Sequence, residues 1–98
     1  MCNITDYLLE LNGFEIDESP VAKIHNKINP NYKSYIKTVE DNHITVNVGF
    51  SNKDPENGWT VHVDDLDFRS IAMVDISTVE QYNALLKLLN IDDCIVCV

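Results

Sequence analysis

The most reactive side chains of this 98-residue chain are three cysteines, and Cys94 and Cys97 have the C-x-x-C spacing of redox and zinc sites. In a redox site this motif lies at a helix N-terminus, which lowers the pKa of one thiol. Here it follows the last predicted helix, and no second C-x-x-C completes a zinc site. We therefore expect both residues to be small apolar side chains of a packed tail, and the odd set with Cys2 to be reduced thiols in the cytosol.

The histidines, His25, His43 and His62, could bind a metal or transfer protons. Their spacing contains neither H-x-H nor H-x-x-x-H, so it gives little support to a shared metal site. His62 alternates with Val61 and Val63 in a predicted strand, and this places it on the polar face. A small metal- or ligand-binding enzyme that uses His62 and nearby aspartates is one hypothesis. An ordinary polar surface residue is the favoured interpretation.

Asp64, Asp65 and Asp67 resemble ligands for Ca²⁺ or Mg²⁺. The segment lacks the alternating oxygen ligands, the glycine and the distal glutamate of a calcium loop, so we predict a solvated hairpin turn. The glycines are isolated, which argues against a phosphate-binding loop, and no G-x-S-x-G motif supplies a nucleophile. We predict that the protein is not an enzyme and holds neither a metal nor a cofactor.

Acidic residues give the chain a net charge of −9, distributed as −5 in residues 1–22, +4 in 23–37 and −8 in 38–98. An acidic surface repels phosphate backbones and anionic lipids and attracts basic proteins. Lys23, Lys27, Lys33 and Lys37 lie among tyrosines, as in a nucleic-acid patch, but the overall charge favours an internal counter-charge. We expect no direct contact with nucleic acid and none with a membrane.

Helical periodicity occurs at both ends of the chain. Near the start, Asn3 can cap a short helix that Gly13 ends. Near the end, Ser77 and Glu80 have the spacing of a capping box. The stripe of that second helix consists of Val79, Tyr82, Leu85, Leu86 and Leu89. Its regular spacing makes it the clearest element in the sequence.

Strand patterns occupy the middle of the chain. Residues 32–40, 44–50, 59–63 and 68–76 alternate or run apolar, and polar turns separate them. Pro20 and Pro30 interrupt residues 15–31, which we predict to be loop or sheet edge with a short strand near 21–28. The last segment, residues 94–98, is an apolar tail that either joins the sheet or contacts another copy.

These patterns predict one α+β domain over residues 1–98. Its antiparallel meander of three to five strands is flanked by an N-terminal helix and by a C-terminal helix packed on one sheet face. The predicted core is the following set: Ile44, Val46, Val48, Phe50, Trp59, Val61, Val63, Ile71, Met73, Tyr82, Leu85, Leu86 and Leu89.

The leading functional hypothesis is a small, acidic, non-catalytic protein-binding module. Its acidic face, drawn from Asp54, Glu56, Asp64, Asp65 and Asp67, would bind a basic protein surface. Mimicry of a nucleic acid is one form of this hypothesis, and the size and acidity suit accessory proteins of phages and mobile elements. The alternative is a structural homodimer that pairs through the tail, from Cys94 to Val98.

Overall fold

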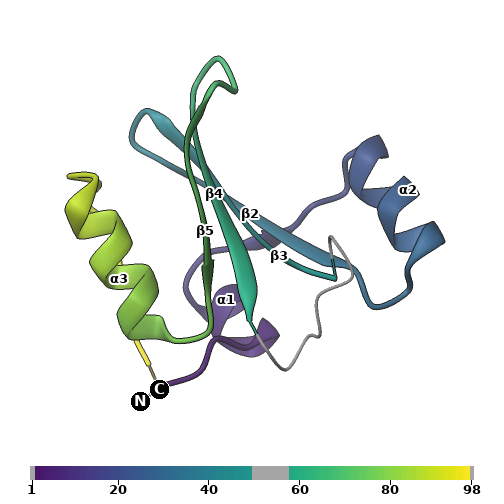
Figure 1. The fold of residues 1–98 in the computed structure, drawn as a ribbon, viewed down its shortest axis with the longest axis horizontal. Helices are drawn as coiled ribbons and strands as arrows, with labels where there is room; N and C mark the ends of the chain where they lie inside the picture. The colour runs from purple at the N-terminus through teal and green to yellow at the C-terminus, as the bar shows by residue number, and fades with distance from the viewer. Residues whose placement is uncertain (1, 50–57, 98) are drawn as a thin grey trace.

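A computed structural model describes residues 2–49 and 58–97 (Figure 1). Five antiparallel strands form one sheet in chain order: β1 (Glu15–Ile16), β2 (Lys33–Val39), β3 (Asn42–Val48), β4 (Trp59–Asp65) and β5 (Ser70–Ile76). The helices are α1 (Asp6–Leu11), α2 (Pro20–Ile28) and α3 (Val79–Leu88). The predicted α+β meander with terminal helices is confirmed. None of the described helices is long and apolar enough to cross a membrane.

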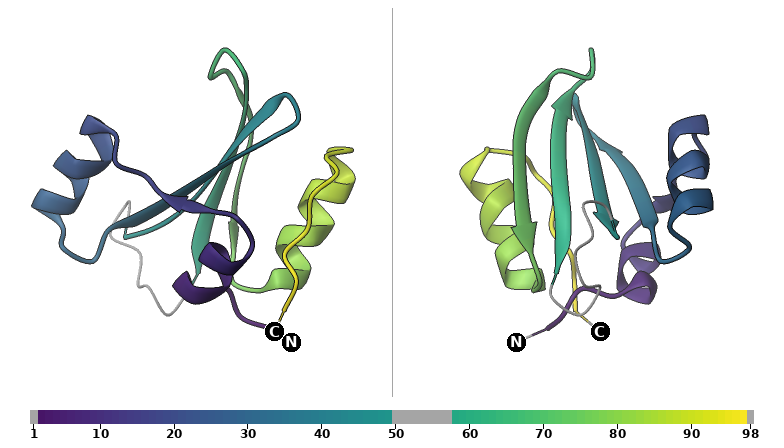
Figure 2. Two further views of the ribbon diagram at one scale, coloured as in Figure 1. Left: turned by 180° about the vertical axis from the view of Figure 1, so that it is seen from behind. Right: turned by 45° about the vertical axis from the view of Figure 1, so that its right-hand side comes forward.

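One face of the sheet is covered by α1, α3 and the tail, and we call it the covered face (Figure 2). Alternation along β3 and β4 sends Ile44, Val46, Val61 and Val63 to this face, where each is fully buried. Leu9 of α1 and the α3 residues Tyr82 and Leu86 complete the contact from the other layer. Sheet and helices therefore share one core.

The N-terminal helix begins at a different cap from the predicted one. The Leu8 N–H donates to Thr5 Oγ1 at 3.2 Å, so Thr5 and not Asn3 caps α1. Asn3 instead forms an isolated antiparallel bridge with Thr78. Gly13 follows the helix at φ +90°, a conformation that favours glycine, and Phe14 is buried behind it.

The cap of α3 is shifted by one residue from the prediction. Thr78 Oγ1 accepts from the Gln81 N–H, and Gln81 Oε1 accepts from the Thr78 N–H, both at 3.2 Å. Glu80 is thereby free to accept from the backbone N–H of Cys2 at 3.2 Å. The capping box thus fixes α3, while Glu80 binds the N-terminal segment beside it.

For residues 15–31 the expectation of a sheet edge is confirmed at Glu15–Ile16, which forms the edge strand β1, but the short strand expected near residues 21–28 is wrong, because Pro20–Ile28 is the helix α2. Ser19 is the N-cap and accepts from the Ala22 N–H at 3.2 Å, while Pro20 takes the first helical position. The side chains of Asn26 and Asn29 donate to the carbonyls of Tyr32 and Gly49, each at 2.8 Å. These amides tie α2 to the residues just before β2 and just after β3.

The cysteine prediction is also corrected, because a disulfide joins Cys2 to Cys97 across 95 positions of sequence. Both ends of the chain lie side by side in Figures 1 and 2. Cys94 remains a free, exposed thiol, and Cys97 is exposed as well, so neither is a packed apolar residue. The sequence predicted reduced thiols, whereas the fold brings Cys2 to Cys97.

The tail follows α3 back along the protein without forming a strand. The Ile95 N–H donates to Asn83 Oδ1 at 2.8 Å, and the Val96 N–H donates to Asn12 Oδ1 at 2.9 Å. Both asparagines donate in return to the carbonyls of the same two tail residues. Ile95 is buried in the core, so the tail is docked within its own chain.

Candidate functional site: the outer face of the sheet

The side of the sheet away from α1 and α3 is the candidate site, and we call it the outer face. Strand register assigns the following residues to it: Glu15, Ser34, Ile36, Thr38, His43, Thr45, Asn47, Thr60, His62, Asp64, Met73 and Asp75. Ile36, Thr45, His62 and Met73 stand opposite one another and form one row across four strands. This face includes two of the three histidines.

Large apolar side chains are exposed on the outer face and beside it. Ile36 and Met73 of this face are 41% and 65% exposed, and Ile71, which has no partner at the irregularity of β5, is 49% exposed. The prediction that Ile71 and Met73 belong to the core is therefore wrong: β5 has an apolar run, and the sequence does not show which of its two faces is covered. Phe50, another predicted core residue, lies outside the described residues.

Charge is segregated between the two faces of the sheet. On the outer face the charged side chains are the carboxylates of Glu15, Asp64 and Asp75. The lysines of β2, Lys33 and Lys37, alternate with Ile36 and so project to the other side. The outer face is consequently both apolar and acidic.

Lys33 and Lys37 each pair with an acid on the covered side, which supports their interpretation as internal counter-charge. Lys33 Nζ lies 2.5 Å from Asp6, and Lys37 Nζ lies 2.8 Å from Asp93. Lys23 and Lys27 lie instead on α2. Lys23, Lys27 and Lys33 nevertheless line one cavity, whereas Lys37 does not.

Only part of the predicted acidic face can be located. Asp54 and Glu56 lie outside the described residues. Asp64, Asp65 and Asp67 lie at the β4–β5 turn, where β4 ends and β5 begins. Asp64 is on the outer face, while Asp65 and Asp67 form ion pairs with Arg69 at 3.1 and 3.2 Å.

Asp65 organises this turn. Its Oδ1 accepts the backbone N–H groups of Asp67 and Arg69, each at 2.9 Å. These bonds, together with the nearby guanidinium group, hold the pKa of Asp65 below its usual range. Asp65 is therefore committed to turn structure, as the predicted hairpin requires, and Asp64 is the member of the set that faces outward.

An exposed aromatic side chain stands beside these acids. Phe68 is 72% exposed, and its ring stacks on His43 with the ring centroids 4.4 Å apart. Its φ of +61° is unusual for a bulky residue, because this conformation brings Cβ close to the backbone. The β2–β3 turn contributes Glu40, also at positive φ, at the same end of the sheet. Both turns thus have a residue with a long or bulky side chain, Glu40 or Phe68, at a positive φ where glycine is usual.

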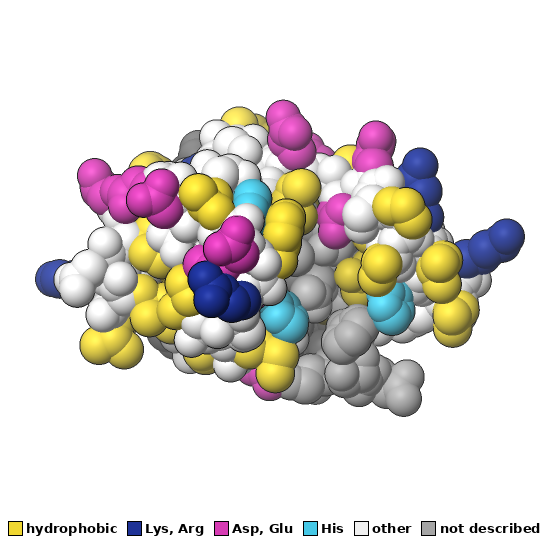
Figure 3. Space-filling model, turned by 90° about the horizontal axis from the view of Figure 1, so that it is seen from above, with side chains coloured by type: hydrophobic (Ala, Val, Ile, Leu, Met, Phe, Trp, Pro, Cys, Tyr) yellow, Lys and Arg dark blue, Asp and Glu magenta, His cyan; other side chains and the backbone are white. Residues whose placement is uncertain are grey.

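Helix α2 adds a second apolar surface. Val21, Ile24 and Ile28 are 63%, 58% and 78% exposed, because α2 faces the sheet with its small residue Ala22. In Figure 3 hydrophobic side chains gather over α2 at the right, on the same side of the molecule as the hairpin ends. The spacing of Val21, Ile24 and Ile28, with Ser19-Pro20 before it, was a helical signal that the sequence analysis missed.

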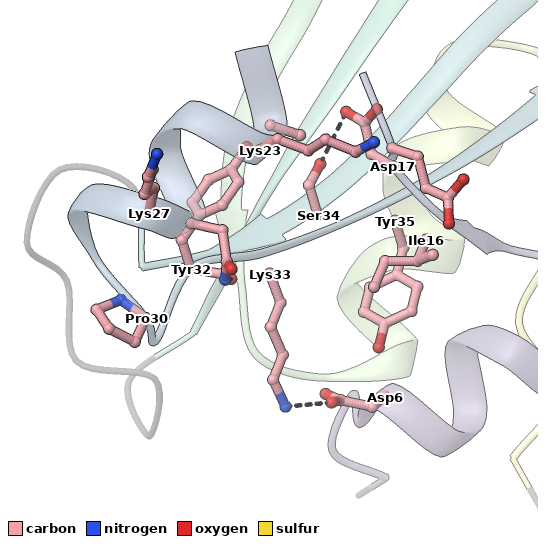
Figure 4. A pocket seen from close by; sticks show the side chains of 13 residues that line it. Asp6, Ile16, Asp17, Lys23, Lys27, Pro30, Tyr32, Lys33, Ser34 and Tyr35 are labelled. Carbon is pink, nitrogen blue, oxygen red and sulfur yellow. Dashed lines mark hydrogen bonds and ion pairs between the residues drawn. The ribbon is translucent and has the colours of Figure 1, made fainter. Parts of the chain in front are cut away.

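A cavity of about 610 Å³ lies between α2, β2 and the segment before α2 (Figure 4). Asp6 and Lys33 form their ion pair on one side of it. On another side, the Ser34 hydroxyl donates to Asp17 at 3.5 Å, which is a long hydrogen bond. Both carboxylates (Asp6, Asp17 and Glu18) and lysines (Lys23, Lys27 and Lys33) line the cavity, so it presents no single charge to a ligand.

The remaining predicted sites are separate in space. His62 lies in the central row of the outer face and His43 stacks on Phe68, whereas His25 is on α2 near Tyr32. Within residues 2–49 and 58–97, no three His, Cys, Asp or Glu side chains are grouped in a way that could hold a metal ion. The buried Asn47 Oδ1 has no hydrogen-bond partner, and nothing in the structure explains it.

Comparison with known proteins gives no relative. No protein-family model, no curated protein and no solved structure matches this chain. The outer face and its chemistry are therefore the basis for a functional proposal.

Proposed function

We propose that this protein is a non-catalytic protein-binding module whose outer sheet face binds a basic, amphipathic protein surface. The apolar side chains Ile36 and Met73, which stand in one row on either side of Thr45 and His62, would contact the apolar side of the partner. The carboxylates of Glu15, Asp64 and Asp75 would face its lysines and arginines. Protein interfaces combine such apolar contacts with polar and charged side chains around them.

The observation that carries this proposal is the segregation of charge across the sheet. Lys33 and Lys37 pair with acids on the covered side, while the outer face holds carboxylates among exposed apolar residues. Complementary charge mainly raises the association rate and selects the partner, while buried apolar contacts supply affinity. The expected complex is therefore sensitive to salt but is not held by charge alone.

Nucleic-acid mimicry is a narrower form of the same proposal, in which the partner's basic surface normally binds a phosphate backbone. The acidic turn with Asp64, Asp65 and Asp67 favours it, and the apolar outer face favours an ordinary protein surface instead. We retain the broader form.

The cytosolic location is likewise a prediction. The Cys2–Cys97 disulfide argues against it, since such bonds persist mainly in oxidising compartments.

The test compares Ile36→Lys with Leu88→Lys, because each replaces an exposed apolar side chain by lysine on a different surface. Ile36 is on the outer face, whereas Leu88 is 79% exposed on α3. Wild-type protein and both variants are immobilised and exposed to host lysate at ~50 and ~300 mM salt, which spans strong and weak screening. A basic protein identified by mass spectrometry is then titrated by calorimetry.

We expect Ile36→Lys to weaken that binding about tenfold or more, since it removes an apolar contact and adds a like charge. Leu88→Lys should bind as the wild type does, and higher salt should weaken the wild-type complex. Equal affinity of the two variants would exclude the outer face as the binding surface, and binding that is unchanged by salt would exclude recognition of a basic surface by charge.

A further inference from the structure

Helix α2 has an apolar stripe that no described part of the chain covers. Val21, Ile24 and Ile28 are exposed, and their spacing places them along one side of the helix. The buried residue of α2 is Ala22, which lies on the side toward the sheet. A helix that keeps its apolar side in solvent can dock that side on an apolar surface of another molecule.

The charge of α2 is opposite to that of the protein as a whole. Lys23, His25 and Lys27 lie on this helix, which contains no Asp or Glu, whereas the chain has a net charge of −9. At about 100° per residue, Lys27 and His25 lie on the two sides of the apolar stripe. Helix α2 is therefore a basic, amphipathic element of an acidic protein.

We propose that α2 of a second copy of the chain is the partner that the outer face binds. The inference rests on the proposed function, in which the outer face binds a basic, amphipathic surface. The apolar stripe of α2 would lie along the row that contains Ile36 and Met73. Its lysines would face the carboxylates of Glu15, Asp64 and Asp75.

The two apolar surfaces have similar lengths. Val21 and Ile28 are seven residue steps apart, which corresponds to about 10 Å of helix. Ile36 on β2 and Met73 on β5 stand at the ends of a row across four strands, and three strand spacings separate them by about 14 Å. A helix laid along this row would therefore contact both apolar side chains with one stripe.

Charge selects α2 over the other helices as the docking element. Two acidic copies repel each other at long range, so self-association needs local compensation. Among the described helices only α2 has basic side chains without an acidic one. Lys23 and Lys27 line the cavity beside β2 but remain exposed, so they can reach carboxylates of a second copy.

The proposed contact joins two different surfaces of the chain. Around a twofold axis, each copy would dock its α2 on the outer face of the other, and the dimer would contain the contact twice. Without such an axis, the same contact would link copies into a longer assembly. In both arrangements, a change to either surface in every copy removes all of the contacts.

Sedimentation velocity over ~1 to ~500 μM protein tests the contact with one variant on each surface. Ile24→Asp on α2 brings a carboxylate to the acidic outer face, and Met73→Lys on the outer face brings an ammonium group to the basic helix. Each variant alone therefore has no intact contact. A mixture restores one contact, between the unchanged outer face of the first variant and the unchanged α2 of the second.

Leu88→Asp and Leu88→Lys are the matched controls, because they introduce the same charges at an exposed apolar position of α3. Every sample, including the reference protein, carries Cys94→Ser, since the exposed thiol of Cys94 could link two copies covalently. Circular dichroism checks that each variant keeps its fold.

The reference protein is expected to self-associate, and Ile24→Asp and Met73→Lys should each raise the dissociation constant about tenfold or more. The two Leu88 controls should associate as the reference protein does. The mixture of Ile24→Asp and Met73→Lys should form a heterodimer. Such a recovery cannot arise from variants that have unfolded.

A reference protein that stays monomeric over the whole range excludes a second copy as the partner. Self-association that persists in Ile24→Asp or in Met73→Lys, or a mixture that forms no heterodimer, excludes the contact between α2 and the outer face. The lysate comparison of Ile36→Lys with Leu88→Lys tests the outer face separately. A monomer whose lysate partner is lost in Ile36→Lys would overturn this inference and leave the proposed function intact.

Discussion

Reduction of the Cys2–Cys97 disulfide is expected to lower the free energy of unfolding by about 4 kcal/mol. The bond joins residues 95 positions apart, so it restricts nearly the whole unfolded chain. In the chain-entropy account, the benefit of a disulfide grows with the length of the loop it closes. A loss of this size is a large fraction of the stability of a small domain.

The reduced protein should nevertheless keep its fold, because other bonds hold the two ends. The Val79 N–H donates to the Cys2 carbonyl at 2.8 Å, and the Cys2 N–H donates to Glu80. At the other end, Ile95 is buried and its N–H is bound by Asn83. The effect of reduction should therefore appear in stability and not in secondary structure.

Urea unfolding of the wild type, with and without a phosphine reductant, measures this difference. Cys97→Ser should reproduce the reduced protein, while Cys94→Ser should match the oxidised wild type, because Cys94 is not in the bond. A difference below about 1 kcal/mol would show that the unfolded chain gains little freedom when the bond is broken. Equal loss in Cys94→Ser would mean that the pairing is wrong.

The part of the fold that the sequence predicted is the part with local periodicity. Ile44, Val46 and Val48 alternate with polar residues, and β3 forms where that alternation lies. The stripe of α3 likewise places Tyr82 and Leu86 in the core. Helix caps were predicted less well. At the start of α3, Ser77 and Thr78 are adjacent residues that both carry a hydroxyl group, and Thr78 is the N-cap. Which of the two caps the helix depends on where the preceding strand ends.

Two of the features that the sequence did not predict depend on tertiary structure, whereas helix α2 had a local signal. It was missed because Pro20 was interpreted as an interruption, although proline is favoured at the first helical position that it occupies. Ile71 and Met73 were placed in the core because the run in β5 does not show which face is covered. The Cys2–Cys97 bond depends on both ends of the chain meeting, and no local spacing encodes that.

Of the candidate site, the sequence predicted the type of surface better than its position. Asp64 was identified as a surface carboxylate, and it lies on the outer face. The apolar component, with Ile36 and Met73, could be recognised only once the helices were seen to cover the opposite side. Acidity is a property of composition, whereas a binding face is a property of the assembled sheet.

Replacement of Asp93 by alanine is expected to lower the free energy of unfolding by about 3 to 5 kcal/mol, the usual cost of breaking a buried ion pair. Asp93 Oδ1 pairs with Lys37 Nζ at 2.8 Å, and its Oδ2 accepts from the Tyr82 hydroxyl at 2.8 Å. The side chains of Lys37 and Asp93 are 22% and 11% exposed. Asp93 therefore ties the tail to both the sheet and α3.

The loss of unfolding free energy in Asp93→Ala should exceed that of one hydrogen bond, because Lys37 and Tyr82 both lose their contact with the carboxylate. Tyr82 is fully buried, and burial is the main cause that raises the pKa of its hydroxyl, so it cannot adapt by ionising. Lys37 would keep its bond to the Asn12 carbonyl and its position 5.5 Å from the centre of the Phe14 ring. Those contacts would hold the Lys37 ammonium group in place, but they would not neutralise its positive charge.

A double-mutant cycle separates these contributions. Tyr82→Phe removes the hydroxyl that Asp93→Ala leaves without an acceptor, so the double variant should recover about 1 to 3 kcal/mol relative to the sum of the single losses. Asp92→Ala is the control, because it removes the adjacent, exposed carboxylate and should change stability by less than about 0.5 kcal/mol. If Asp93→Ala costs no more than Asp92→Ala in urea unfolding, then the network does not hold the tail, and the buried Ile95 must do so alone.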